Sequence, residues 1–241
     1  MVQQPSDVHF AMVSLSTGVT LHYAECGERK GQAIIFLHAY TDSWFAFCRV
    51  LHLLSPSYHA LAPDERGHGN SDKPECCYTV EDFTADVDAK MRALEDPISP
   101  EFVREFHRST IHHPVPEEFL STALSETLKV PARVWRGYME GVVLTVDDTT
   151  RLGEIDAPTL ILWGERDAIL GREEQEWRSR AIPDARLKVY PDTGHAVAFE
   201  RSEWVVRDLE EFIEGTRPAA WFSMESRLRA SQNSPSRHSA E

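Results

Sequence analysis

The sequence is short of the residues on which several classes of protein depend. Its 241 residues include only four cysteines, Cys26, Cys48, Cys76 and Cys77, too few for a disulfide scaffold. Acidic side chains outnumber basic ones by 39 to 25, which gives a net charge of −14, whereas nucleic acids and anionic membranes require a basic surface. We therefore expect reduced thiols, no nucleic-acid partner and no membrane partner.

Long apolar runs are absent as well. None approaches the roughly 20 residues of a transmembrane helix, and residues 1–10 lack the basic and apolar regions of a secretory signal. Apolar residues still form 41% of the chain, which is typical of a globular protein. The sequence thus predicts a cytoplasmic protein. We predict no cofactor and no metal. His112 and His113, with Glu117 or Glu118 nearby, are not expected to bind a metal ion, because adjacent histidines usually face solvent.

Hydrophobic patterning divides the chain into a strand-rich first third, a helical middle and an alternating last third. The predicted strands cover residues 8–15, 19–23, 33–37, 59–62, 159–163 and 186–190. The predicted helices cover residues 44–54, 79–94, 102–106, 119–128, 134–142, 172–181 and 202–214. The continuous apolar run 33–37 indicates a strand buried on both faces. This order predicts a mostly parallel sheet flanked by helices, in one domain over residues 1–214 with a disordered tail over 215–241.

Polar clusters follow the predicted strands at residues 38–44, 64–72, 163–167 and 192–195. An open parallel sheet places its ligands at the carboxyl ends of its strands. We therefore expect these clusters to form one site.

In this order, the clusters resemble the α/β-hydrolase superfamily, in particular its small esterases, enol-lactonases, epoxide hydrolases and haloalkane dehalogenases. The resemblance covers residues 8–214 and implies the α/β-hydrolase fold, with a small apolar ester- or lactone-like molecule as the partner. It also implies that Asp167 is the acid and His195 the base of a catalytic triad. The chemistry agrees, because a carboxylate on one imidazole nitrogen stabilises the imidazolium that forms when the other nitrogen takes a proton.

The resemblance implies roles for two loops. His38, Ala39 and Tyr40 look like the oxyanion-hole loop, with the backbone N–H of Tyr40 as the donor. Ala39 stands where the family usually has glycine, which reaches backbone conformations that cost other residues energy, so we expect a departure in the loop geometry here. In the second loop, Arg66 and His68 look mainly structural.

The helical middle, at about residues 97–150, is similar to the cap that covers the family's active site and selects its substrates. We predict that Trp44, Trp135 and Tyr138 line the substrate pocket. A non-catalytic ligand-binding protein would use the same rings together with Tyr40. Such aromatic stripes are more often core packing than a ligand lining.

The nucleophile of the triad is missing. The family carries it at the centre of a G-x-S-x-G turn between a strand and a helix, with Asp or Cys as alternatives to Ser. Only Gly27 with Gly31 and Gly137 with Gly141 have this spacing, and their central residues are Arg29 and Met139. If any small residue may replace the first glycine, residues 14–18 also match. They lie in the predicted hairpin turn, which is the wrong place for the nucleophile.

The flanking sequence indicates where the elbow was lost. The predicted helix ending near Glu95 runs directly into Asp96 and the start of the cap, where the family has a strand, the elbow, a helix and another strand. Since a strand–helix–strand unit takes roughly 30 residues or more, we estimate that roughly 50 to 60 residues are absent. Strand 33–37 would then either pair with strand 159–163 or leave two buried edges.

Substitute nucleophiles are few. Ser43 and Ser71 have suitable hydroxyls, but Ser71 is expected to cap a turn, and Cys76 and Cys77 have no evident basic neighbour to activate them. Three functions therefore remain open. The chain is a hydrolase of small esters or lactones with weak activity or none, a non-catalytic ligand binder, or a truncated isoform or gene-model product without a function of its own.

Overall fold

The computed structural model describes residues 8–15, 18–74, 96–138 and 149–216. Several sequence predictions lie outside these ranges: helix 79–94, Cys76, Cys77, Met139 and the tail from residue 217. Residues 1–206 form one compact unit and residues 207–241 a second. None of the helices within the described ranges has the length and apolar character that crossing a membrane requires.

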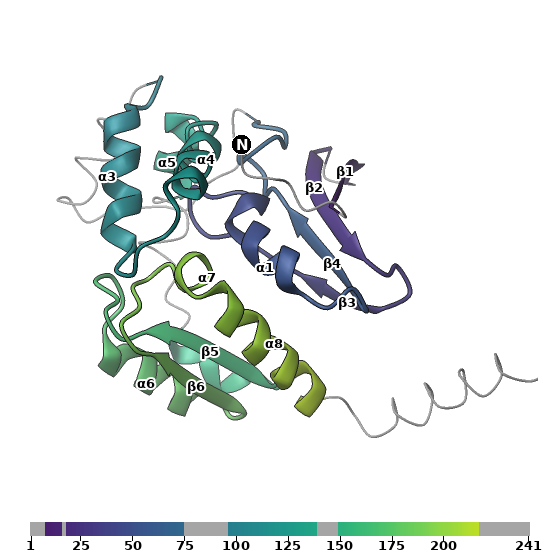
Figure 1. Ribbon diagram of the computed structural model, residues 1–241, viewed down its shortest axis with the longest axis vertical. Coiled ribbons are helices and arrows are strands. Elements are labelled where there is room, and N and C mark those ends of the chain that lie inside the picture. Colours follow the sequence, from purple (N-terminus) through teal and green to yellow (C-terminus); the bar gives the residue numbers. More distant parts are fainter. Residues whose placement is uncertain (1–7, 16–17, 75–95, 139–148, 217–241) are drawn as a thin grey trace, which may run out of the picture. The chain divides into compact units, whose positions relative to one another are not determined.

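The first sheet has four strands in the order β1-β2-β4-β3 (Figure 1). They are β1 (His9–Ser14), β2 (Thr20–Gly27), β3 (Gln32–Ile35) and β4 (Tyr58–Pro63). β1 and β2 form the predicted hairpin, in which Gly18 has a φ of 78°, a conformation open to glycine at no steric cost. β4 runs antiparallel to β2 and parallel to β3, so this sheet is mixed.

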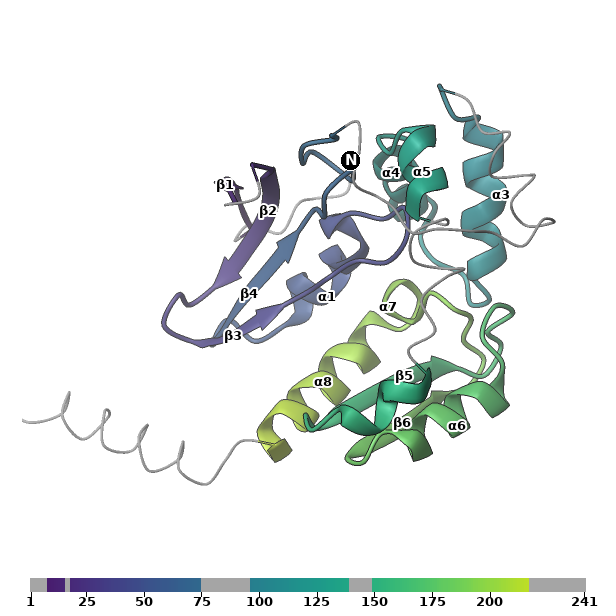
Figure 2. The ribbon, with the colours of Figure 1, turned by 180° about the vertical axis from the view of Figure 1, so that it is seen from behind.

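The two faces of this sheet differ. The short helices η1 (Trp44–Phe47) and α1 (Cys48–Leu53) cover one face, and Ala24, Ala60 and Ala62 are fully buried there. The opposite face, turned toward the viewer in Figure 2, has a hollow of about 600 Å³. Apolar side chains supply most of its lining: Val13, Leu21, Tyr23, Ile35, Leu61 and Pro63.

Burial of residues 33–37 on both faces is a prediction that the structure contradicts. Ile35 and Leu37 each expose 63% of their surface. The physical reason is that β3 has a strand neighbour, β4, on one side only within the described chain, so its apolar side chains lack partners beyond that edge.

The helical middle consists of α3 (Pro100–Thr110), α4 (Glu117–Thr127) and α5 (Ala132–Tyr138) (Figure 1). Ser99 caps α3 by accepting a hydrogen bond from the backbone N–H of Phe102, and Pro100 takes the first helical position, where its missing N–H costs nothing. The three helices, hereafter the helical block, enclose a separate apolar core. Its buried members are Ile98, Val103, Leu120, Leu124, Val130, Ala132, Val134 and Trp135.

The last third forms a second, two-stranded parallel sheet. Its strands are β5 (Thr159–Gly164) and β6 (Ala185–Tyr190), and the helices in this part of the sequence are η3 (Thr149–Glu154), α6 (Arg172–Ala181), α7 (Val197–Glu200) and α8 (Ser202–Thr216). Within the described chain, β5 pairs with β6 alone and β3 with β4 alone. Of the two arrangements expected from the sequence, the direct pairing of strand 33–37 with strand 159–163 is therefore not seen in the described residues.

Candidate active site

The turns that follow β5 and β6 are joined by their backbones. The N–H of Glu165 donates to the carbonyl of Tyr190 at 2.9 Å, and that of Arg166 donates to Thr193 at 2.8 Å. A Cβ on Gly164 would lie 2.0 Å from the carbonyl oxygen of Gly194, so only glycine permits this close approach. The two turns thus hold their side chains at one edge of the sheet.

Asp167 and His195 meet at this edge, as the sequence predicted. The Asp167 side chain is 3% exposed, and its Oδ1 accepts the backbone N–H groups of Ile169 at 2.8 Å and Leu170 at 3.0 Å. Its Oδ2 lies 3.0 Å from Nδ1 of His195. Two main-chain donors therefore fix the carboxylate, which in turn orients the imidazole.

The contact with Asp167 assigns the proton on His195. A carboxylate accepts a hydrogen bond, so Nδ1 carries the proton and Nε2 has a free lone pair. The His195 side chain is 34% exposed, and within the described residues Asp167 is its hydrogen-bond partner. The imidazole is thus set to accept a proton through Nε2, as a general base does.

The predicted oxyanion-hole loop follows β3. His38 is buried, with Nδ1 2.9 Å from the Ala39 carbonyl, and its Nε2 accepts the backbone N–H of Glu65 at 2.9 Å. Both ring nitrogens are used in holding the loop. The left-handed backbone falls on Thr41, with a φ of 63°, and not on Ala39. The φ angle of Ala39 therefore does not show the departure in loop geometry that its sequence position predicts. The strained backbone conformation belongs to Thr41.

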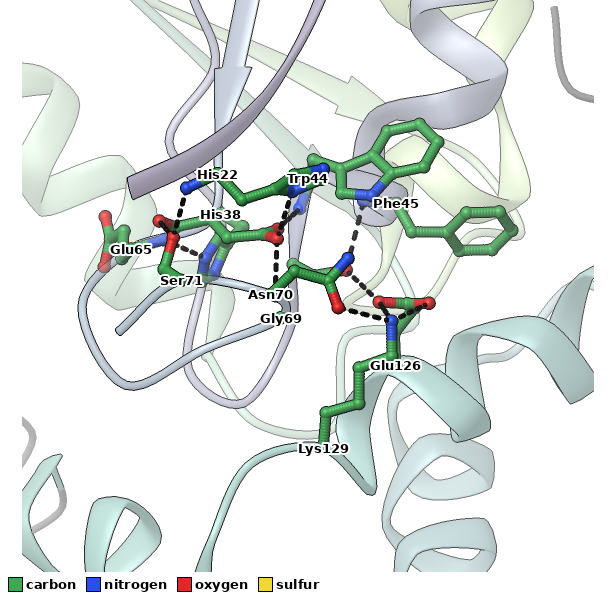
Figure 3. Close-up of polar contacts among 12 residues, drawn as sticks. His22, His38, Trp44, Phe45, Glu65, Gly69, Asn70, Ser71, Glu126 and Lys129 are labelled. Atoms are coloured by element: carbon green, nitrogen blue, oxygen red, sulfur yellow. Dashed lines mark hydrogen bonds and ion pairs between the residues drawn. The ribbon is translucent and has the colours of Figure 1, made fainter. Parts of the chain in front are cut away.

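Asp64 joins this loop to the turn after β4, a role that the sequence did not reveal. It is fully buried, and its Oδ1 accepts the backbone N–H of Trp44 at 2.8 Å. Its Oδ2 accepts the N–H of Asn70 at 2.9 Å and lies 2.7 Å from Nδ1 of His22 (Figure 3). Three segments distant in the sequence therefore meet on one carboxylate. In the same turn, burial lowers the pKa of His68 to about 4, which keeps this histidine neutral in its structural position.

The helical block is attached to the same two loops. Lys129 donates to Oδ1 of Asn70 at 3.3 Å and pairs with Glu126 at 2.7 Å, and Ser43 donates to Glu126 at 3.4 Å (Figure 3). The hydroxyl of Tyr40 donates to the carbonyl of Trp135 at 2.9 Å. These contacts place α4 and α5 next to the loop that the sequence assigned to the oxyanion hole.

The aromatic residues predicted to line the pocket lie in two clusters. Trp135 is fully buried in the core of the helical block, 5.2 Å from the Tyr40 ring between centroids. Trp44 is 5% exposed and packs edge-on against Phe10 and Phe45. The Tyr138 side chain lies outside the described residues. Trp44 and Trp135 therefore act as packing residues, and neither contributes to the hollow on the first sheet.

The two described candidates for a substitute nucleophile have structural partners. The Ser43 hydroxyl accepts the N–H of Phe45 at 3.2 Å and caps η1. The Ser71 hydroxyl donates to the carbonyl of Asp64 at 2.6 Å and accepts the N–H of His22 at 2.8 Å. Both serines are nearly fully buried, and neither is hydrogen-bonded to His195.

Comparison with known proteins is consistent with this geometry. Residues 32–97 match the model of the alpha/beta hydrolase fold family. The chain is 34% identical over 74 residues to mouse epoxide hydrolase 3, covering 30% of this chain and 20% of that protein. It is 35% identical over 86 residues to a non-heme chloroperoxidase of Streptomyces lividans, covering 34% and 30%. The chain thus spans less than a third of the length of these curated relatives.

The solved structures decide the fold. A putative aryl esterase from Burkholderia cenocepacia superposes with a TM-score of 0.72 at 20% identity, over 86% of this chain and 98% of that one. The esterase EaEST from Exiguobacterium antarcticum superposes with a TM-score of 0.70 at 17% identity, over 86% and 100%. The chain has the α/β-hydrolase fold. The family match includes the His38 loop and the Asp64 turn, whereas Asp167 and His195 lie beyond it and are placed by the structure.

Proposed function

We propose that this chain is an α/β-hydrolase that retains the acid and the base of a site for small ester- or lactone-like molecules and lacks the nucleophile. The observation that carries this proposal is the 3.0 Å contact between Asp167 and His195, with a buried carboxylate and an Nε2 that receives no hydrogen bond from the described residues. That arrangement supplies what a catalytic base needs. It leaves turnover weak or absent, because the sequence holds no G-x-S-x-G turn.

The missing segment belongs to the proposal as well. We place it between Glu95 and Asp96, directly before the helical block, as a deletion from an otherwise family-like chain. The printed names of the relatives, which include esterases and epoxide hydrolases, support small apolar substrates. The small number of cysteines supports a cytoplasmic location.

Hydrolysis of p-nitrophenyl acetate tests the missing nucleophile. We expect the unmodified chain and His195→Ala to hydrolyse the ester at rates within about twofold of each other, because the described candidates for a nucleophile that His195 could activate, Ser43 and Ser71, are held in other hydrogen bonds. His52→Ala, a change at an exposed position on α1, is the matched control. Turnover that His195→Ala abolishes and His52→Ala retains would show that a nucleophile does act in this chain, contrary to the proposal.

A graft tests the acid and the base. A strand–elbow–helix–strand segment of the kind that carries the nucleophile in α/β-hydrolases, inserted between Glu95 and Asp96, should confer ester hydrolysis. Either His195→Ala or Asp167→Asn in the grafted chain should remove that activity. A grafted chain that unfolds cooperatively yet hydrolyses no ester would refute the assignment of Asp167 and His195.

A further inference from the structure

The loop that carries His195 is hydrogen-bonded to the helical block. The backbone N–H of Ala196 donates to the carbonyl of Thr110, the last residue of α3, at 3.1 Å. The residues that follow Thr110 connect α3 to α4, and His113 lies among them. The residue directly after His195 is thus hydrogen-bonded to the helical block.

Glu200, at the end of α7, joins the same two segments through its side chain. It is 6% exposed, and its two carboxylate oxygens lie 3.0 and 2.9 Å from the backbone nitrogen of Gly194. One of them also accepts the N–H of His113 at 2.5 Å. Burying a carboxylate is costly unless hydrogen bonds compensate it, and here the compensating donors are one N–H from each segment.

Gly194 is the point at which the segments touch. A Cβ on it would lie 2.7 Å from Oε1 of Glu200, 2.7 Å from the backbone nitrogen of His112 and 2.8 Å from the carbonyl oxygen of Thr110. Two of these atoms are backbone and cannot rotate away. The residue directly before His195 is therefore enclosed by Glu200 and by the connection between α3 and α4.

A second set of contacts surrounds the first at the surface. Asp192 lies 3.0 Å from Nε2 of His112 and 3.7 Å from Nδ1 of His113. Arg201 holds the other side of the loop, donating to the carbonyl of Asp192 at 3.0 Å and to the hydroxyl of Thr193 at 3.1 Å. Asp192 is 65% exposed, so these contacts add less than the buried contacts of Glu200.

We infer that Glu200 is a positioning residue. Through its hydrogen bonds to Gly194 and His113, it holds the His195 imidazole in its hydrogen bond to Asp167. The position of the imidazole then depends on the position of the helical block. This inference rests on the proposed role of His195 as a base. The carboxylate accepts a donor from each segment, so a displacement of the α3–α4 connection withdraws one hydrogen bond and loosens the peptide next to His195.

Glu200→Gln tests the inference, because it keeps the shape of the side chain and replaces one acceptor oxygen with an N–H donor. Glu203→Gln, at an exposed position three residues later, is the matched control. The first measurement is the downfield proton resonance of His195 Nδ1–H in its hydrogen bond to Asp167, which Asp167→Asn identifies by removing it. The second is hydrogen exchange at the Gly194 amide.

In Glu200→Gln we expect the Nδ1–H resonance to be lost or broadened and the Gly194 amide to exchange about tenfold faster or more, as follows from losing a hydrogen bond to a charged acceptor. Glu203→Gln should change neither. A Glu200→Gln protein that keeps both signals unchanged would overturn the inference, because a merely structural Glu200 would lower the melting temperature without altering the His195 proton.

Gly194→Ala gives the second test if Glu200→Gln does not fold. It retains every polar group and forces Glu200 and the α3–α4 connection away from the loop, so the same two signals should weaken. Unchanged signals would again refute the inference. Neither measurement requires turnover, so failure of the proposed hydrolase site and failure of this inference are separate outcomes.

Discussion

Mild acid should destabilise this protein through histidines that are buried in the neutral form. His107, on α3, is 3% exposed, and its Nε2 lies 2.7 Å from the Thr127 hydroxyl on α4. Burial lowers the pKa of His107 to about 4, whereas the ordinary value is about 6.5. Between these two values, the unfolded chain binds a proton that the folded chain does not.

The sign and size of the effect follow from proton linkage. The unfolded state binds more protons below pH 6.5, so the free energy of unfolding falls as the pH is lowered and levels off near pH 4. For one such histidine, the loss between pH 7 and pH 5 is about 2 kcal/mol. His68 has a similarly lowered pKa and adds a comparable loss, a large part of a typical total stability of about 5–15 kcal/mol.

His107→Gln isolates the contribution of His107. Urea unfolding at pH 7, 6 and 5 should show the variant losing about 2 kcal/mol less than the unmodified protein over that range. Thr127→Val is the control: it removes the hydrogen bond but leaves the buried imidazole, so it should lower stability at every pH by a similar amount. Equal losses with pH in the His107→Gln variant and the unmodified protein would refute this reasoning.

Three other variants test separate parts of the structure. Thr41→Gly should raise the free energy of unfolding by about 1 kcal/mol, because a φ of 63° strains any residue with a Cβ; a lower urea midpoint would contradict this. Asp64→Asn should cost about 2–3 kcal/mol, because Trp44 and other donors lose a buried acceptor; a loss below about 1 kcal/mol would show that the neutral amide suffices. The unmodified protein should associate with rising concentration in sedimentation velocity and Ile35→Lys with Leu37→Lys should associate less, because both apolar side chains are exposed at a sheet edge; equal behaviour of the two proteins would contradict this.

The parts of the site that the sequence predicted depend on local patterns. Asp167 and His195 each follow a strand with a clear apolar run, and parallel strands bring their carboxyl ends together although 28 residues separate the two side chains. The first hairpin was likewise predictable from two short strands around Gly18. In each case a single strand and its adjacent turn contained the information.

Other features depend on contacts between distant segments, which no local pattern encodes. Asp64 was recognisable as part of a polar turn, but its bonds to His22 and Trp44 reach 42 and 20 residues along the chain. Glu200 bonds to His113, 87 residues away, and a buried glutamate on a short helix has the same sequence signature as an exposed one. Burial of the apolar run 33–37 cannot be predicted from its sequence for the same reason, since burial depends on neighbours outside the strand.

The arrangement of the strands also determines how the two halves of the proposed site can be coupled. The His38 loop follows β3 and His195 follows β6, and within the described chain these strands belong to different sheets. The contacts of Phe199, on α7, link the two parts instead. Arg49 of α1 donates a hydrogen bond to the backbone carbonyl oxygen of Phe199. The Phe199 ring packs edge-on against the ring of Phe119 on α4, with the centroids 5.0 Å apart. Side-chain packing fixes relative position less strictly than a ladder of backbone hydrogen bonds does. A strand paired with both β3 and β5, which the described residues do not contain, would supply a more rigid link between the two loops, so we expect the position of His195 to depend on Glu200 and the helical block.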